Sequence, residues 1–125
     1  APVMRAHRIT LEQMAMLEPT MAETISSMLV SILGEAMEEA VNRGVPYEAA
    51  KDFMLGHVNI QLGIVFEKVN PFSDACLVAM EYGRRAMIKG NWKELFNPDK
   101  VYEQIDVMLH PEKLSQLAFK EEQRP

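Results

Sequence analysis

The longest apolar stretch of the chain, residues 53–66, contains no Asp, Glu, Lys or Arg. Charged residues border it on both sides, with Asp52 before it and Glu67 after it. Fourteen residues are too few for a helix to cross a bilayer. Apolar side chains would cover opposite sides of such a helix, with Phe53 and Ile60 on one and Leu62 on the other. A helix that is apolar nearly all round is normally surrounded by protein, so the pattern predicts a buried central helix.

Start and stop signals predict two helices before this stretch. Thr10 with Gln13 three residues later is a capping-box pattern, which begins a short helix. Pro19 disfavours helical geometry at the residue before it and suits the first position of a new helix. We therefore expect a break there and a second helix from Pro19 to about Asn42, which Gly44 ends.

The rest of the chain also predicts helices only, because no strand-like alternation and no internal repeat occurs. The expected segments are 46–68, 73–89, 91–96, 98–109 and 112–119. The sequence thus predicts an all-α bundle of about five to six helices around the buried central helix. We expect one domain over residues 10–119 and a frayed tail over residues 120–125. The chain begins Ala1-Pro2-Val3, so residues 1–9 are interpreted as a linker from a missing N-terminal domain, with processing as the alternative.

Composition narrows the class of protein. The net charge of −5 disfavours nucleic acid and anionic membranes as partners. Neither a signal peptide nor an apolar run of membrane-spanning length occurs in the sequence. A single cysteine, Cys76, allows no disulfide framework and no zinc-type spacing, which favours a reducing compartment. We therefore expect a cytoplasmic protein.

Acidic and hydroxyl side chains gather around the helix start predicted at Pro19. Glu18 and Glu23 flank it, and Thr20 and Thr24 follow it one turn apart. Helix N-termini attract anions through their unsatisfied N–H groups and the helix dipole. Thr20 and Thr24 are therefore candidate ligands for the carboxylate of a small carboxylic acid substrate. Glu18 and Glu23 are candidates for proton transfer.

Polar side chains interrupt the apolar helix at His57, Asn59 and Gln61. His57 and Gln61 are one helical turn apart and therefore adjacent. Because buried polar groups need partners, His57 has two interpretations. It is either a core histidine bonded to a backbone carbonyl or a neighbouring side chain, or a catalytic acid–base group. In the second case Gln61 is a candidate substrate ligand beside it. The sequence leaves both open.

Other chemistries have less support. No serine or cysteine sits in an elbow motif, and the three histidines lie far apart, so neither nucleophilic catalysis nor a zinc site is predicted. An alternative is a metal-assisted isomerase that binds a hard cation through a group of glutamates. Carboxylates on exposed helices are common, so no metal site is predicted. The glutamates concerned are Glu18, Glu23, Glu35, Glu38 and Glu39.

Two stretches are similar to a known dehydrogenase family: LEPTMAE at Leu17–Glu23 and FMLGHVNI at Phe53–Ile60. Over about residues 1–110, the chain resembles the C-terminal helical domain of phosphogluconate-dehydrogenase-like proteins. These proteins are related to 6-phosphogluconate and 3-hydroxyacid dehydrogenases and include apionate-oxidoisomerase-like enzymes. The resemblance implies an enzyme whose N-terminal Rossmann domain binds NAD or NADP. The helical domain would complete the substrate cleft, form much of a homodimer interface and hold no cofactor itself.

The resemblance also implies where catalytic groups lie. They come from the start of the first long helix of this domain, which matches Glu18 and Glu23, with His57 on the adjacent central helix. The wider superfamily uses a lysine within a glycine-rich helix start, and this sequence has neither there, so the acid or base stays open. We expect the substrate-cleft and dimerisation domain of an NAD(P)-dependent oxidoreductase for a sugar acid or hydroxyacid, inactive alone. The alternative is a stand-alone helical dimerisation or ligand-binding module.

Overall fold

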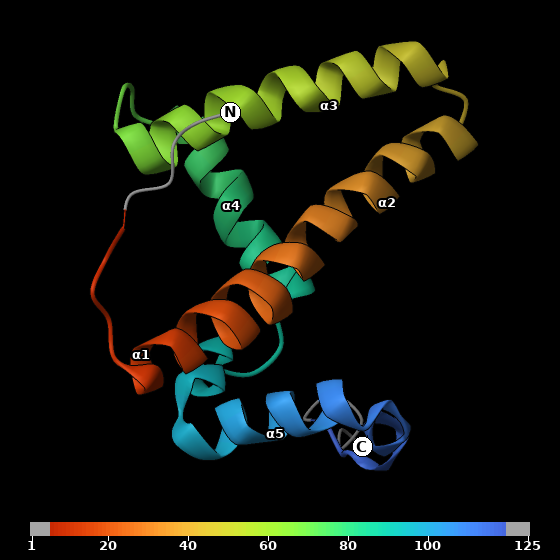
Figure 1. Ribbon diagram of the computed structural model, residues 1–125. Helices are drawn as coiled ribbons and strands as arrows, with labels where there is room; N and C mark the ends of the chain where they lie inside the picture. The colour runs from red at the N-terminus through yellow and green to blue at the C-terminus, as the bar shows by residue number, and fades with distance from the viewer. Residues whose placement is uncertain (1–5, 120–125) are drawn as a thin grey trace. The chain divides into compact units, whose positions relative to one another are not determined.

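The computed structural model describes residues 6–119, and every regular element in that range is helical (Figure 1). The α-helices are α1 (Leu11–Ala15), α2 (Met28–Asn42), α3 (Tyr47–Leu62), α4 (Asp74–Met87) and α5 (Pro98–Leu109). The π-helical segments are η1 (Met16–Ser27) and η2 (Gly63–Glu67), and the 3₁₀ segments are η3 (Trp92–Phe96) and η4 (Pro111–Gln116). The predicted all-α class is confirmed.

The described chain falls into two compact units. Unit 1 contains the residues up to Met28 and those from Gly90 onward, and unit 2 contains Leu29–Lys89. Unit 1 therefore holds α1, η1, η3, α5 and η4, while unit 2 holds most of α2 together with α3, η2 and α4. The predicted frayed tail and the first five residues of the predicted linker lie outside the described residues.

The first helix begins as predicted but does not stop as predicted. The Gln13 N–H donates to Thr10 Oγ1 (3.1 Å), and the Thr10 N–H donates to Gln13 Oε1 (2.8 Å), which completes the capping box. The expected break at Pro19 is wrong, because η1 continues through this proline without interruption. In a regular α-helix the proline ring clashes with the carbonyl four residues earlier. The wider i→i+5 turn of a π-helix relieves that clash.

The turn after α2 confirms the predicted glycine stop. The Gly44 N–H donates to the Val41 carbonyl and the Val45 N–H donates to the Ala40 carbonyl, each at 3.0 Å. These two bonds form a Schellman motif, which satisfies carbonyls that the helix end leaves unpaired. Gly44 has φ +109°, a left-handed conformation that residues with a Cβ rarely adopt. A glycine is therefore required at this turn.

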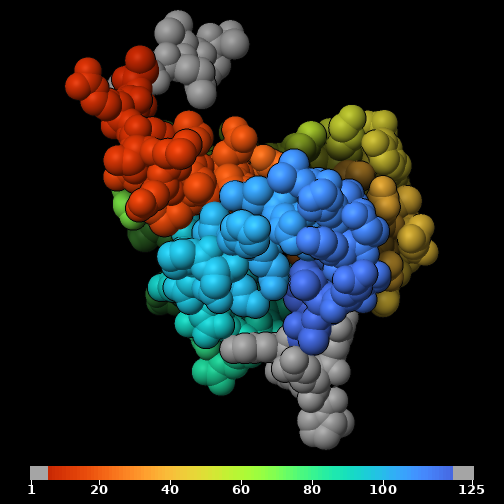
Figure 2. Space-filling view, turned by 60° about the horizontal axis from the view of Figure 1, so that its bottom comes forward, coloured from red at the N-terminus to blue at the C-terminus, as the bar shows by residue number. Residues whose placement is uncertain are grey.

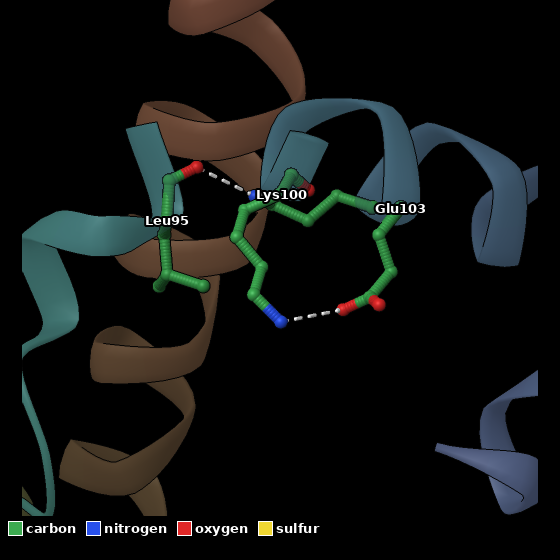
Figure 3. A network of polar contacts seen from close by, with 4 residues as sticks. Leu95, Lys100 and Glu103 are labelled. Carbon is green, nitrogen blue, oxygen red and sulfur yellow. Dashed lines mark hydrogen bonds and ion pairs between the residues drawn. The ribbon is translucent and has the colours of Figure 1, made fainter. Parts of the chain in front are cut away.

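Unit 1 has a small interior where η1 packs against α5 and η3. Figure 2 looks onto the blue surface of α5 and η4, with α1 in red. The buried residues among the described part of unit 1 are Pro19, Thr20, Val101 and Gln104. The Gln104 amide nitrogen donates to the carbonyl oxygens of Leu95 (2.8 Å) and Lys100 (3.0 Å) and so ties η3 to α5 (Figure 3). Leaving such a buried group unpaired costs about 1–3 kcal/mol, so this amide fixes the end of η3.

Ion pairs in unit 1 lie on its surface. Lys100 pairs with Glu103 (3.5 Å) within α5 (Figure 3). Lys113 of η4 pairs with Asp106 of α5 (2.9 Å). The hydrogen bond and charge of Asp106 raise the pKa of Lys113 above 10.5. A raised lysine pKa contributes stability below the unfolded value, and this contribution is lost as pH rises through the folded value. Because the pair is exposed, its contribution is small and is screened by salt.

Unit 2 differs most from expectation. Helix α3 was expected to be buried, yet Phe53 is 70% exposed and Phe66 of η2 is 73% exposed. Ala50 is the one buried residue among the described residues of unit 2. The prediction of a buried central helix is wrong for the single chain, because α2 and α4 do not pack along α3. Figure 1 shows α2 and α3 diverging from the turn at Gly44.

Helix ends in the second half follow local signals. The Cys76 N–H donates to Ser73 Oγ (3.2 Å), which confirms the predicted cap of α4. Pro98 occupies the first turn of α5, and α5 ends before His110-Pro111 as expected. The last predicted helix, 112–119, is instead the shorter 3₁₀ segment η4. No helix among residues 6–119 is long and apolar enough to cross a membrane.

Candidate functional site

The six candidate site residues divide between the two units. Glu18, Thr20, Glu23 and Thr24 belong to η1 in unit 1. His57 and Gln61 belong to α3 in unit 2. The structure thus brings the residues of each group together on one helix, and we describe the two groups separately.

The π-helical form of η1 decides how its acidic groups lie. Its hydrogen bonds join residues five apart, so Glu18 and Glu23 occupy adjoining turns on the same side. In a regular α-helix, residues five apart point in clearly different directions. Both glutamates are exposed. The sequence placed them on either side of a helix start, and the structure instead places both within one continuous helical segment.

The two threonines of η1 differ in exposure. Thr24 is half-buried, whereas Thr20 is 0% exposed and its Oγ1 has no hydrogen-bond partner among the described residues. A ligand on the surface of unit 1 therefore does not reach the hydroxyl of Thr20. Thr20 instead belongs to the small interior that η1 forms with α5.

His57 has both a defined tautomer and an exposed ring. Its Nδ1 lies 3.0 Å from the carbonyl oxygen of Phe53 and its ring stacks on the Phe53 ring, with centroids 4.2 Å apart. A carbonyl oxygen only accepts, so Nδ1 carries the hydrogen and a neutral ring presents its lone pair at Nε2. This backbone carbonyl is one of the two kinds of hydrogen-bond partner expected for a core histidine. The ring is not in a core, however, because His57 is exposed, as is Gln61 one turn further along α3.

Two hollows in the described residues contain none of the candidate residues. One, of about 530 Å³, surrounds Val65 and Phe72 in unit 2. The other, of about 460 Å³, lies in unit 1 where α1 and the start of η1 face η3 and α5. It is lined by Glu12, Ala15, Met16, Phe96, Pro98, Val101, Tyr102 and Ile105. Sequence reasoning missed this hollow, because it gave segment 98–109 only as a helix. Among the described residues, no group of three or more His, Cys, Asp or Glu is placed to hold a metal ion.

Comparison with protein families decides the classification. The family described as phosphogluconate dehydrogenase (decarboxylating), C-terminal, matches residues 1–109. The chain belongs to this family. The resemblance that its sequence motifs carry is therefore confirmed, and it covers nearly all of the described helices.

Curated relatives extend well beyond this chain. A D-apionate oxidoisomerase of Rhizobium rhizogenes is 49% identical over 102 residues, which are 81% of this chain and 37% of the relative. A D-apionate oxidoisomerase of Cupriavidus necator is 44% identical over 106 residues, which are 84% of this chain and 38% of the relative. The chain thus spans less than two-fifths of the length of either relative.

A solved structure shares the fold. A crystal structure described as a semialdehyde dehydrogenase NAD-binding protein of Cupriavidus necator, in complex with calcium and NAD, matches with a TM-score of 0.80. It is 44% identical, and the match covers 85% of this chain and 39% of that one. NAD sites of the Rossmann type need a strand, a glycine-rich loop and a helix N-terminus. Residues 6–119 contain no strand, so these described residues do not form a site of that type.

Proposed function

We propose that this chain is the C-terminal domain of an NAD(P)-dependent oxidoreductase that acts on a sugar acid or related hydroxyacid. In this proposal it completes the substrate cleft and provides a homodimer interface, while the nucleotide binds to another part of the protein. The family match over residues 1–109 carries the proposal. The longer relatives named D-apionate oxidoisomerase and the NAD-containing neighbour support it.

The side chains of this domain would bind the substrate and move a proton. Oxidising a hydroxyl group to a carbonyl releases the hydroxyl proton, which a general base accepts. His57 suits this role, because its Nδ1–H is held by the Phe53 carbonyl and Nε2 presents a lone pair. The carboxylates of Glu18 and Glu23, exposed on η1, are the other candidates. Thr24 and Gln61 offer neutral hydrogen-bond groups to a substrate carboxylate or hydroxyl.

A second candidate function is a stand-alone helical dimerisation or ligand-binding module. The observation that favours it is the exposed apolar surface of α3, which calls for a partner whether or not the protein is an enzyme. The two candidates differ in turnover. A module binds a partner or a ligand without converting it, whereas the oxidoreductase reduces a nicotinamide nucleotide.

Turnover by the native full-length protein tests the proposal. D-apionate and a panel of other hydroxyacids are supplied with NAD or NADP, and formation of the reduced nucleotide is followed. We expect turnover with at least one sugar acid and at least tenfold lower kcat/KM with the matching acid amide, because the carboxylate is the group that the cleft binds. A folded full-length protein that turns over no sugar acid with either nucleotide would contradict the proposal.

A further inference from the structure

The His57 side chain lies exposed on α3, and the two contacts that hold its ring both come from Phe53. Its Nδ1 is 3.0 Å from the Phe53 carbonyl oxygen. Its ring stacks on the Phe53 ring, with the planes 24° apart and the centroids 4.2 Å apart. An exposed side chain that nothing holds samples several staggered rotamers. The direction in which His57 presents the lone pair of Nε2 therefore depends on Phe53.

The hydrogen bond to the carbonyl is by itself a weak restraint. In an α-helix such as α3, a carbonyl oxygen also accepts the main-chain N–H four residues later, so the His57 ring shares this oxygen. Water competes for an exposed donor, and a hydrogen bond of this kind contributes little net free energy. The bond selects the tautomer with the hydrogen on Nδ1, because a carbonyl oxygen only accepts. A second contact is needed to keep the ring in the rotamer that makes this bond.

The Phe53 ring provides this second contact. Residues four apart are neighbours on a helix surface, which brings the two rings together. Contacts between two aromatic rings shift a conformational equilibrium by roughly 2- to 12-fold. Stacking covers one face of the imidazole, whereas the Nε2 lone pair lies in the plane of the ring and points outward from its edge. The stack thus restrains the ring and leaves the in-plane direction of the proton-accepting atom open.

Packing within the chain does not explain the phenyl ring of Phe53. Phe53 is 70% exposed, and Ala50 is the one buried residue among the described residues of unit 2. Phe66 of η2 is a matched comparison, because it is 73% exposed and lies more than two turns further along the helix than His57. The two phenylalanines therefore differ in their contact with the imidazole rather than in exposure.

We propose that Phe53 is a positioning residue that sets the tautomer and the direction of the His57 ring for proton transfer. This inference rests on the proposed function, in which His57 accepts the hydroxyl proton of the substrate. Phe53 acts through the imidazole and does not itself bind the substrate. When the phenyl ring is removed, the imidazole leaves the carbonyl in a larger fraction of molecules. Fewer molecules then hold Nε2 ready to accept a proton.

Nitrogen NMR of the native full-length protein with isotope-labelled histidine tests the contact without any turnover. The His57 signal is identified by its absence in His57→Gln. In alkaline solution, where histidine is neutral, we expect the hydrogen mainly on Nδ1 in the wild type. In Phe53→Leu, the ratio of the Nδ1–H to the Nε2–H tautomer should fall by about 2- to 12-fold. Phe53→Tyr, which keeps the stack, and Phe66→Leu, the matched control, should both keep the wild-type ratio.

A wild-type ratio in Phe53→Leu, or an equal fall in Phe66→Leu, would overturn the proposal. The wild type alone gives a further check that does not depend on any variant folding. Nuclear Overhauser contacts between the ring protons of Phe53 and His57 are expected, because the ring centroids are 4.2 Å apart. Their absence would equally overturn the proposal.

Kinetics test whether Phe53 acts through His57. With the sugar acid and nucleotide that give the wild type its highest turnover, Phe53→Leu should lower kcat by about 2- to 12-fold and leave KM within about twofold. Phe53→Tyr should restore kcat, and Phe66→Leu should not change it. In the His57→Gln background, Phe53→Leu should cause no further loss, because the effects of residues that act as a unit do not add. A further loss equal to that in the single variant would overturn the proposal.

The two measurements separate this inference from the oxidoreductase assignment. Wild-type turnover in Phe53→Leu with an unchanged tautomer ratio would overturn the role of Phe53 and leave the oxidoreductase standing. A tautomer ratio that depends on Phe53, in a wild type that turns over no sugar acid, would support the orienting contact and count against the oxidoreductase.

Discussion

His57→Gln in the native full-length protein should lower kcat by about 10²–10⁴-fold, the usual contribution of a general base. Glutamine keeps a polar side chain of similar reach but has no basic nitrogen. The His57 ring is exposed, and its contacts are one carbonyl and the stacked ring of Phe53. We therefore expect the free energy of unfolding to change by less than about 1 kcal/mol. Steady-state kinetics and urea unfolding of the same preparation give the two values.

His110→Gln is the matched control for this variant. His110 is also exposed, precedes η4 and lies 3.8 Å from the Glu112 carboxylate. The His110→Gln variant should leave kcat unchanged within about twofold, because no candidate site residue lies in or next to η4. A wild-type kcat in His57→Gln, at saturating substrate and with the fold intact, would remove His57 from the proton-transfer step.

Glu23→Gln should have the second-largest effect, a fall in kcat of at least about 10²-fold, if the η1 carboxylates take part in proton transfer. The exposed Glu23 lies on the same side of the π-helix as Glu18. Glutamine preserves the shape and removes the charge, so stability should stay within about 0.5 kcal/mol. Glu18→Gln, measured in parallel, shows which of the two carboxylates is essential.

Glu38→Gln is the control for the loss of one negative charge from an exposed helix. Glu38 lies on α2 in unit 2 and is exposed like Glu23. We expect this variant to match the wild type in kcat and KM. A fall confined to KM in Glu23→Gln would indicate substrate binding, and wild-type values in both Glu23→Gln and Glu18→Gln would eliminate the η1 carboxylates as catalytic groups.

Local signals in the sequence predicted the helix ends well, because each depends on a few neighbouring residues. The Thr10 capping box, the Ser73 cap and the Gly44 stop all form as their residue types predict. Pro19 shows the limit of such signals. A proline usually ends a helix, but the π-helical hydrogen bonding of η1 accommodates it, and no residue pattern marked this register.

Burial could not be predicted from periodicity alone. The uncharged stretch of α3 indicates an apolar surface that needs covering, but a sequence does not say which chain covers it. Thr20 was instead expected to be accessible to a ligand. Its type and position suggested a ligand contact, yet packing of η1 against α5 buries it completely. For His57, a backbone carbonyl partner was one of the alternatives that the sequence left open, whereas an exposed ring was not expected for a core histidine.

The intact mass of the native gene product, measured in its source cells, tests the central claim most directly. The claim is that this 14.2 kDa chain is the C-terminal domain of a longer NAD(P)-dependent oxidoreductase. The relatives, of which it covers less than two-fifths, have about 280 residues, so the product should exceed 14.2 kDa by roughly one nucleotide-binding domain. A native product of about 14.2 kDa would contradict the claim and leave the stand-alone helical module.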